Sequence, residues 1–221
     1  MKHNTQSIAH AIRMAGSGNA ILPGFTGTIA EMLTELLAIR EREQQDADKL
    51  QHGRDQAKAQ LESITGMVAA LECDYDRLEA LRETRDELQA AVSEAVEDSD
   101  LQAATEELAE WPDAEELAEL EEAAGDCSDR DTARERIQED ALGILVSATW
   151  TPGETPEPEG FEILLCTGGP AVRIVGELDQ YKHPDRAWLE YQDWGTPWTE
   201  YHGAHDSAAL LAYSQQFYFG E

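Results

Sequence analysis

The sequence has little positive charge, little cysteine and no long apolar run, and each shortage excludes a class of protein. Its 221 residues include 16 Lys and Arg against 46 Asp and Glu, which gives a formal net charge of −30. This charge makes nucleic acid and anionic membranes poor direct partners, and it favours a basic protein surface or a cation. No stretch approaches the roughly 18 apolar residues of a membrane-spanning helix.

The three cysteines are Cys73, Cys127 and Cys166, and no two of them form a C-x-x-C pair. An odd number of widely spaced cysteines argues against a disulfide framework or a zinc site and favours a reducing compartment. The first residues also lack the continuous apolar core of a signal peptide. We therefore expect a cytoplasmic protein.

Motifs that identify a reaction are missing as well. The glycine-rich run GSGNAILPGFTG, residues 16–27, fits neither a P-loop nor a dinucleotide-binding pattern, so residues 1–27 are interpreted as an N-terminal segment that ends in a loop. We expect no enzymatic activity and no cofactor, and function has to be inferred from charge and architecture.

The distribution of the acidic residues is uneven. Between Asp86 and Asp129 the chain has 17 acidic residues and no Lys or Arg, in a background rich in Ala, Leu, Glu and Gln. A helix rises about 1.5 Å per residue, so such a segment would carry a carboxylate about every 4 Å, against about 3.4 Å between phosphates along one DNA strand. The stretch predicts nucleic-acid mimicry; a solvated acidic coiled-coil face is the alternative.

Hydrophobic spacing predicts a helical arm over residues 28–140. Thr28 and Glu31 form a capping box that starts one helix, and Gly66 marks an expected bend. From residue 67 to 92 the spacing alternates between four and three, which is typical of a coiled-coil seam with polar positions at Asp74 and Arg85. The seam pairs either with the 28–64 helix in an antiparallel hairpin or with a second chain in a homodimer. The seam positions are Met67, Leu71, Asp74, Leu78, Leu81, Arg85, Leu88 and Val92.

Near Ala141 the period changes from helical to alternating, and strands are predicted at residues 144–150, 161–166, 171–178 and 186–194. A C-terminal helix capped by Asp206 follows. The predicted fold is therefore α+β: a long acidic helical hairpin or coiled-coil arm, followed at residues 141–221 by a small antiparallel sheet domain with a C-terminal helix.

Two clusters could carry chemistry, and neither is our preferred site. Glu200, His202, His205 and Asp206 include ligand types suited to a divalent metal, but Gly203 places them in a loop that does not fix both rings on one face, so no metal site is predicted. Cys166 could act as a nucleophile with His183 or His202 as its base, yet a free cysteine in an alternating strand normally packs as a small hydrophobic residue.

Aromatic residues are dense after residue 190. The segment YQDWGTPWTEY interleaves them with Gly, Pro and acids, so Trp194, Trp198 and Tyr201 are candidate interface anchors beside the core-packing alternative.

Three C-terminal segments, FEILLCTGGPAVRIVGELDQY, RAWLEYQDWGTPWTEY and QFYFGE, resemble small acidic proteins encoded by phages and prophages of Gram-negative bacteria. The resemblance covers about residues 65–221 and includes the junction IQEDALG. It implies a mobile-element protein that acts in the cytoplasm of a bacterial host, a setting in which acidic inhibitors of host nucleases are common. The group has no assigned chemistry, so no catalytic residue carries over.

Together these observations predict a phage-encoded inhibitor that mimics nucleic-acid charge and blocks a host nucleic-acid-binding defence protein of the CRISPR or restriction type. The alternative is a non-enzymatic coiled-coil adaptor whose C-terminal domain binds a protein. The carboxylates expected to contact the partner are Glu106, Glu107, Glu110, Asp113, Glu115, Glu116, Glu119, Glu121 and Glu122.

Overall fold

The structure, a computed structural model, describes residues 29–150, 152–153, 155–203 and 207–220. The chain divides into two units, residues 1–47 and 48–221. Of the first unit, the described part is the beginning of helix α2, Ile29–Glu72, whose remainder belongs to the second unit. The expected N-terminal segment 1–27 and the Thr28 cap lie outside the described residues.

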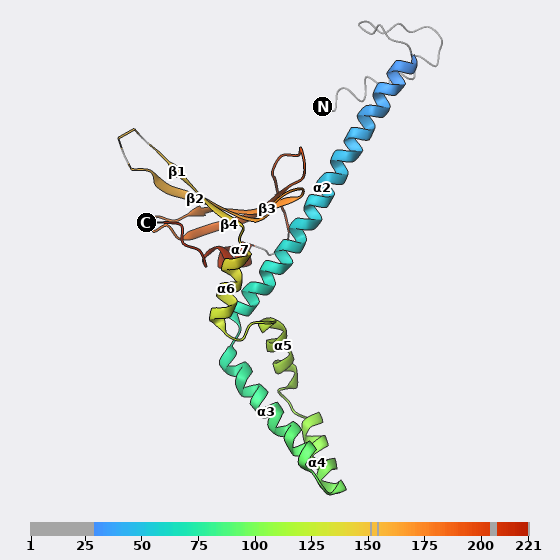
Figure 1. Cartoon of the computed structure of the whole chain (residues 1–221), viewed down its shortest axis with the longest axis vertical. Coiled ribbons are helices and arrows are strands. Elements are labelled where there is room, and N and C mark those ends of the chain that lie inside the picture. Colours follow the sequence, from blue (N-terminus) through green and yellow to red (C-terminus); the bar gives the residue numbers. More distant parts are fainter. Residues whose placement is uncertain (1–28, 151, 154, 204–206, 221) are drawn as a thin grey trace. The chain divides into compact units, whose positions relative to one another are not determined.

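The predicted α+β class is confirmed, with helices on both sides of residue 72 and one antiparallel sheet (Figure 1). The helices after α2 are α3 (Tyr75–Glu94), α4 (Asp98–Ala109), α5 (Ala114–Ala124), α6 (Arg130–Asp140) and α7 (Ser207–Ser214). The strands are β1 (Gly143–Thr149), β2 (Glu157–Cys166), β3 (Ala171–Leu178), β4 (Pro184–Gln192) and β5 (Thr199–Glu200).

The sheet is a meander in which each strand pairs with the next, in the order β1-β2-β3-β4-β5. The four longer strands overlap the predicted ones, although β2 begins four residues and β4 two residues before the predicted start. The fifth, β5, was missed because it has two residues, too few to show an alternating pattern. The predicted C-terminal helix is present as α7, while its expected cap, Asp206, lies outside the described residues.

One face of the sheet is the inner, apolar face. Ile163, Ile174 and Leu189 lie opposite one another across β2, β3 and β4, and all three are fully buried. Helices α2, α6 and α7 cover this face. The helical residues of the core are Ala57, Leu61, Ile64, Met67, Val68, Ala70, Leu71, Ala133, Ile137, Leu210 and Tyr213.

Helix α2 passes over β4 at a glycine. A Cβ atom at Gly53 would lie 2.8 Å from Cδ2 of Tyr191, so the absence of a side chain lets the helix approach the sheet closely. Next to it, Nδ1 of His52 lies 3.1 Å from Oδ2 of the buried Asp193. Gly66 is exposed, and a Cβ there would meet no atom within 4 Å. The helix runs through both glycines, so the bend expected at Gly66 is wrong.

The predicted coiled-coil seam is wrong because the helix that should carry it ends at Glu72. Asp74 is not a seam position: it is the N-cap of α3, where its side chain accepts a hydrogen bond from the backbone N–H of Arg77. Met67 and Leu71 belong to the core below the sheet, whereas Leu78 and Leu81 pack against α5. Four of the six apolar seam positions are thus divided between two cores of one chain, while Leu88 and Val92 are partly buried and belong to neither core.

Residue 140, the expected boundary between the arm and the sheet domain, lies within a continuous structure. The core below the sheet includes Leu61 of α2 and Ile137 of α6 together with the strands after residue 141. The hydroxyl of Tyr213 in α7 also donates a hydrogen bond of 2.8 Å to the Asp140 carboxylate. The C-terminal half of α2 therefore completes the sheet's core.

The close approach at Gly53 yields a first prediction. Gly53→Ala forces the Tyr191 ring or the helix to move, whereas Gly66→Ala adds a methyl group in open space and improves helix propensity. We expect Gly53→Ala to have a free energy of unfolding about 1–3 kcal/mol below that of Gly66→Ala, measured by urea denaturation. Equal stability of the two variants would contradict the packing of α2 on β4.

A second prediction concerns Leu78 and Leu81, which expose 1% and 2% of their surface. Each truncation to Ala should cost about 2–5 kcal/mol because it leaves a cavity between α3 and α5. Urea denaturation should show this loss for either variant, and the mass in solution should match that of the wild type at equal concentration, because both side chains pack within one chain. If the variants changed mass in solution but kept their stability, the result would support a coiled-coil seam between two chains.

Candidate functional site

Helices α3, α4 and α5, here called the acidic helices, contain most of the stretch that lacks Lys and Arg. Helix α3 packs against both α4 and α5. The buried part of its contact with α5 is apolar: Leu78 and Leu81 of α3 are buried with Leu117 and Ala124 of α5. Trp111, in the turn between α4 and α5, lies partly buried against this cluster. A small second core therefore holds α3 and α5 together, with the turn after α4 packed against it.

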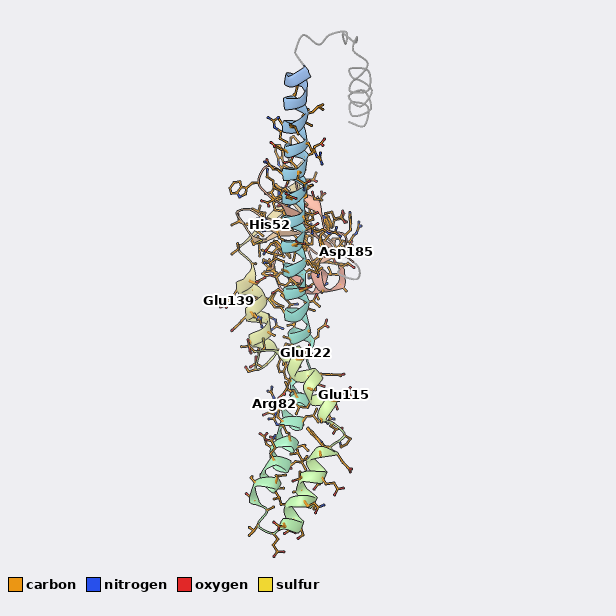
Figure 2. All side chains as sticks on the ribbon, turned by 90° about the vertical axis from the view of Figure 1, so that its right-hand side faces the viewer. His52, Arg82, Glu115, Glu122, Glu139 and Asp185 are labelled. Atoms are coloured by element: carbon orange, nitrogen blue, oxygen red, sulfur yellow. The ribbon has the colours of Figure 1, made fainter. Side chains whose placement is uncertain are left out.

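The three arginines of α3 all form ion pairs with carboxylates of α5. Figure 2 labels one of them, Arg82. Arg77 forms a bidentate ion pair with Glu116, with Nε to Oε1 at 2.9 Å and Nη2 to Oε2 at 2.6 Å. Arg82 and Arg85 both reach Oε1 of Glu121, at 3.0 and 3.1 Å. The positive charges of this region lie between the helices, where they offset the repulsion between α3 and α5.

These contacts shift the ionisation of the paired groups. Hydrogen bonding by Arg77 holds the pKa of the Glu116 carboxyl below its ordinary value, and the same contact raises the pKa of Arg77. Asp113 is the N-cap residue of α5. It makes no side-chain cap hydrogen bond, and its Oδ2 lies 3.5 Å from Nη2 of Arg77 instead. Three of the nine predicted partner-binding carboxylates, Asp113, Glu116 and Glu121, thus have internal partners.

The other six predicted carboxylates are exposed, and no ion pair among the described residues includes any of them. On α5 they follow one face, three and four residues apart, opposite the buried Leu117 and Ala124. Figure 2 labels Glu115 and Glu122 on this helix. We name these six residues the acidic surface: Glu106, Glu107, Glu110, Glu115, Glu119 and Glu122.

The predicted aromatic anchors are not equivalent in the structure. Trp194 is 70% exposed, and its ring lies against Gly169, where a Cβ would come within 1.9 Å of Cδ1. Trp198 stacks on the guanidinium of Arg173, 4.1 Å from the ring centroid. Tyr201 meets the buried Tyr191 edge-on and packs against the core. Trp194 alone of the three is exposed enough to anchor a partner.

The outer face of the sheet carries a network that the sequence did not reveal. Arg173 of β3 lies between Glu162 of β2 and Glu190 of β4, with N–O distances of 2.7 Å to each, and Trp198 covers its guanidinium. The strand register creates this arrangement: Glu190 lies directly opposite Arg173, and Glu162 lies diagonally across, two residues from Leu164, which pairs with Arg173. A charge pattern alone could not have identified it.

The two clusters considered for chemistry gain no support from the geometry. Among the described residues no group of three or more His, Cys, Asp or Glu side chains could hold a metal, although His205 and Asp206 lie outside them. His202 and Glu200 are exposed, 3.5 Å apart. Burial raises the pKa of the Cys166 thiol, which disfavours the thiolate needed for a nucleophile, and its Sγ lies 4.0 Å from the Pro170 carbonyl oxygen.

Comparison with known protein families, with curated proteins and with solved structures found no match. In the part of the chain that the structure describes, every helix is too short or too polar to cross a membrane.

A third prediction follows from the lowered pKa of Glu116. A group whose folded-state pKa is depressed stabilises the fold above its unfolded pKa and loses that effect as pH falls through the folded value. Glu116→Gln should therefore be less stable than the wild type at neutral pH, and the difference should disappear on acidification below the ordinary glutamate range. Urea denaturation monitored by circular dichroism at several pH values measures this difference in the free energy of unfolding.

Glu115→Gln is the matched control because it removes the same charge from the exposed face of α5. If it lost as much stability as Glu116→Gln at neutral pH, the ion pair with Arg77 would not explain the effect.

Proposed function

We propose that this chain is a non-enzymatic binding protein that docks its acidic surface on a basic, nucleic-acid-binding site of another protein and keeps nucleic acid out of it. One observation carries the proposal. The arginines of α3 are held between the helices, so the surface that α4 and α5 present carries one sign of charge. A surface of one sign attracts an opposite one at long range and raises the association rate.

Because some carboxylates of α5 are paired with arginine, the exposed ones reproduce the phosphate spacing of DNA only in part. Residues three or four apart on the exposed face of α5 rise about 4.5–6 Å along the helix, a wider spacing than the roughly 3.4 Å between phosphates of one DNA strand. The acidic surface thus offers the sign and the row-like order of a nucleic-acid backbone at lower density. Competition for a basic site requires charge and shape there, and it does not require a phosphate-by-phosphate match.

The segments that resemble phage and prophage proteins support a partner from the bacterial host. A nuclease or another component of a CRISPR or restriction system is the class of host protein whose basic channel such a surface would block. An adaptor function is the second candidate. It is favoured by the exposed Trp194 and by the apolar strand β1, neither of which a purely electrostatic inhibitor needs.

The fourth prediction tests the acidic surface. Partners are first isolated from a bacterial host lysate at low and high salt, and binding of the purified partner is then measured. Replacing Glu106, Glu107, Glu115, Glu119 and Glu122 with Gln removes five exposed charges and leaves the Arg77–Glu116 pair intact. Glutamine preserves helix propensity, so the variant should stay folded yet bind at least about tenfold more weakly, and added salt should weaken wild-type binding too.

The matched control replaces five exposed acids of α2 and α6, namely Glu35, Glu41, Glu43, Glu72 and Glu139, with Gln. It has the same change in net charge and should keep most of the affinity. An equal loss of affinity in both variants would show that net charge, and not the acidic surface, determines binding. Full binding by the first variant, or a partner that binds no nucleic acid, would overturn mimicry in favour of the adaptor.

A further inference from the structure

Strand β1 is an apolar strand at the edge of the sheet, and it is exposed on both of its faces. It pairs with β2 on one side and forms the end of the strand order (Figure 1). All seven of its residues are exposed, including Ile144, Leu145 and Val146 at 39%, 67% and 43%. Leu142 before the strand and Trp150 after it are 60% and 61% exposed.

This edge lacks most of the features that keep edge strands from pairing. Such strands are usually protected by Lys, Pro, an inward-pointing charge or a bulge. The segment from Ala141 to Trp150, ALGILVSATW, has no charged residue and no proline in a chain that is 28% charged. A register shift occurs only between Ser147 and Ala148, so Gly143–Ser147 forms a regular edge.

The inner face of the sheet is also left open at this edge. Ile144 lies opposite Ile163 and Val146 opposite Phe161, so both point to the same face as the buried core. Their partial exposure shows that the core continues to β1 without a full cover. Leu145, opposite Glu162, points to the other face. A strand added beside β1 would cover apolar surface on both faces.

We propose that a second copy of this chain covers this edge, with β1 pairing antiparallel to β1 of the partner about a two-fold axis. A register centred on Leu145 places Ile144 of one copy opposite Val146 of the other and brings the two Leu145 side chains together. The inner faces then continue into one another. Isologous pairing of this kind requires one surface that complements itself, which an uncharged strand with this alternation provides.

The exposed area is consistent with a weak dimer. A buried aliphatic side chain removes roughly 60–120 Å² from water at about 25 cal/mol per Å², and an aromatic one about 150–250 Å². Scaled by their exposed fractions, the side chains of Leu142, Ile144, Leu145, Val146 and Trp150 can together bury roughly 200–400 Å² per copy. A standard interface buries about 800 Å² per partner, so main-chain pairing adds to an association that should depend on concentration.

The lack of charge on β1 favours the second copy over the basic partner proposed above. A partner chosen by electrostatics gains nothing from an uncharged edge. Two copies that each carry −30 repel one another, so salt should strengthen self-association by screening this repulsion. Salt should weaken the docking of the acidic surface. The two proposals are independent, and their opposite salt dependence tells them apart.

The fifth prediction is measured by sedimentation equilibrium of the full chain from micromolar to near-millimolar concentration, at low and high salt. We expect the mass to rise from monomer to dimer with concentration, and more readily at high salt. Leu145→Lys should weaken this association by at least about tenfold, because two leucines leave the interface and two like charges face each other. The lysine keeps a favourable cross-strand neighbour in Glu162, so β1 should remain paired with β2.

Tyr181→Lys is the matched control, since Tyr181 is 71% exposed in the turn between β3 and β4. It should dimerise as the wild type does. A chain that is monomeric at every concentration overturns the proposal, and so does a dimer that is insensitive to Leu145→Lys. Hydrogen exchange gives a readout on unaltered protein: β1 amides should gain protection with concentration. Protection that is present in the monomer and lost on removal of residues 1–28 would assign the edge to this chain's own N-terminal segment and also overturn the proposal.

Discussion

The scarcity of positive charge is the constraint on which the rest of the structure depends. With 16 basic residues for 46 acidic ones, most carboxylates have no possible partner, and the position of each arginine decides which acidic elements can meet. Arg77, Arg82 and Arg85 lie between α3 and α5, and Arg173 lies between two glutamates on the outer face of the sheet. Arg130 donates to the Leu71 carbonyl near the end of α2. Arg77, Arg82, Arg85 and Arg173 thus join acidic residues of neighbouring elements.

The positions of the arginines also explain the proposed functional surface. Because the arginines of α3 are paired with carboxylates of α5, the outward faces of α4 and α5 carry negative charge alone. The apolar contacts of Leu78, Leu81 and Leu117 supply the cohesion that charge cannot, and they fix which glutamates point inward. Stability and function therefore draw on different members of one acidic stretch: Glu116 and Glu121 bridge the helices, while Glu115, Glu119 and Glu122 face solvent.

Local patterns in the sequence predicted the elements well and their partners poorly. Alternation between residues 144 and 192 predicted the long strands, and adjacency along the chain then determined a meander. The heptad-like spacing across residues 67–92 misled because two successive helices happen to continue one rhythm through the break at Cys73 and Asp74. Which acids pair with arginine could not be predicted, since Arg77 and Glu116 are far apart in the chain and meet only through α3–α5 packing.

The central claim is that the carboxylates of one acidic stretch are divided into an internal and an external set. Carbodiimide-driven amidation of the free protein, quantified by mass spectrometry for each residue, tests it without any partner. Glu106, Glu107, Glu115, Glu119 and Glu122 should react fast, and Glu116 should react slowly until Arg77→Ala removes its ion pair. If Glu116 reacts as fast as Glu115 in the wild type, Arg77 does not hold the Glu116 carboxylate as described, and the division into two sets is wrong.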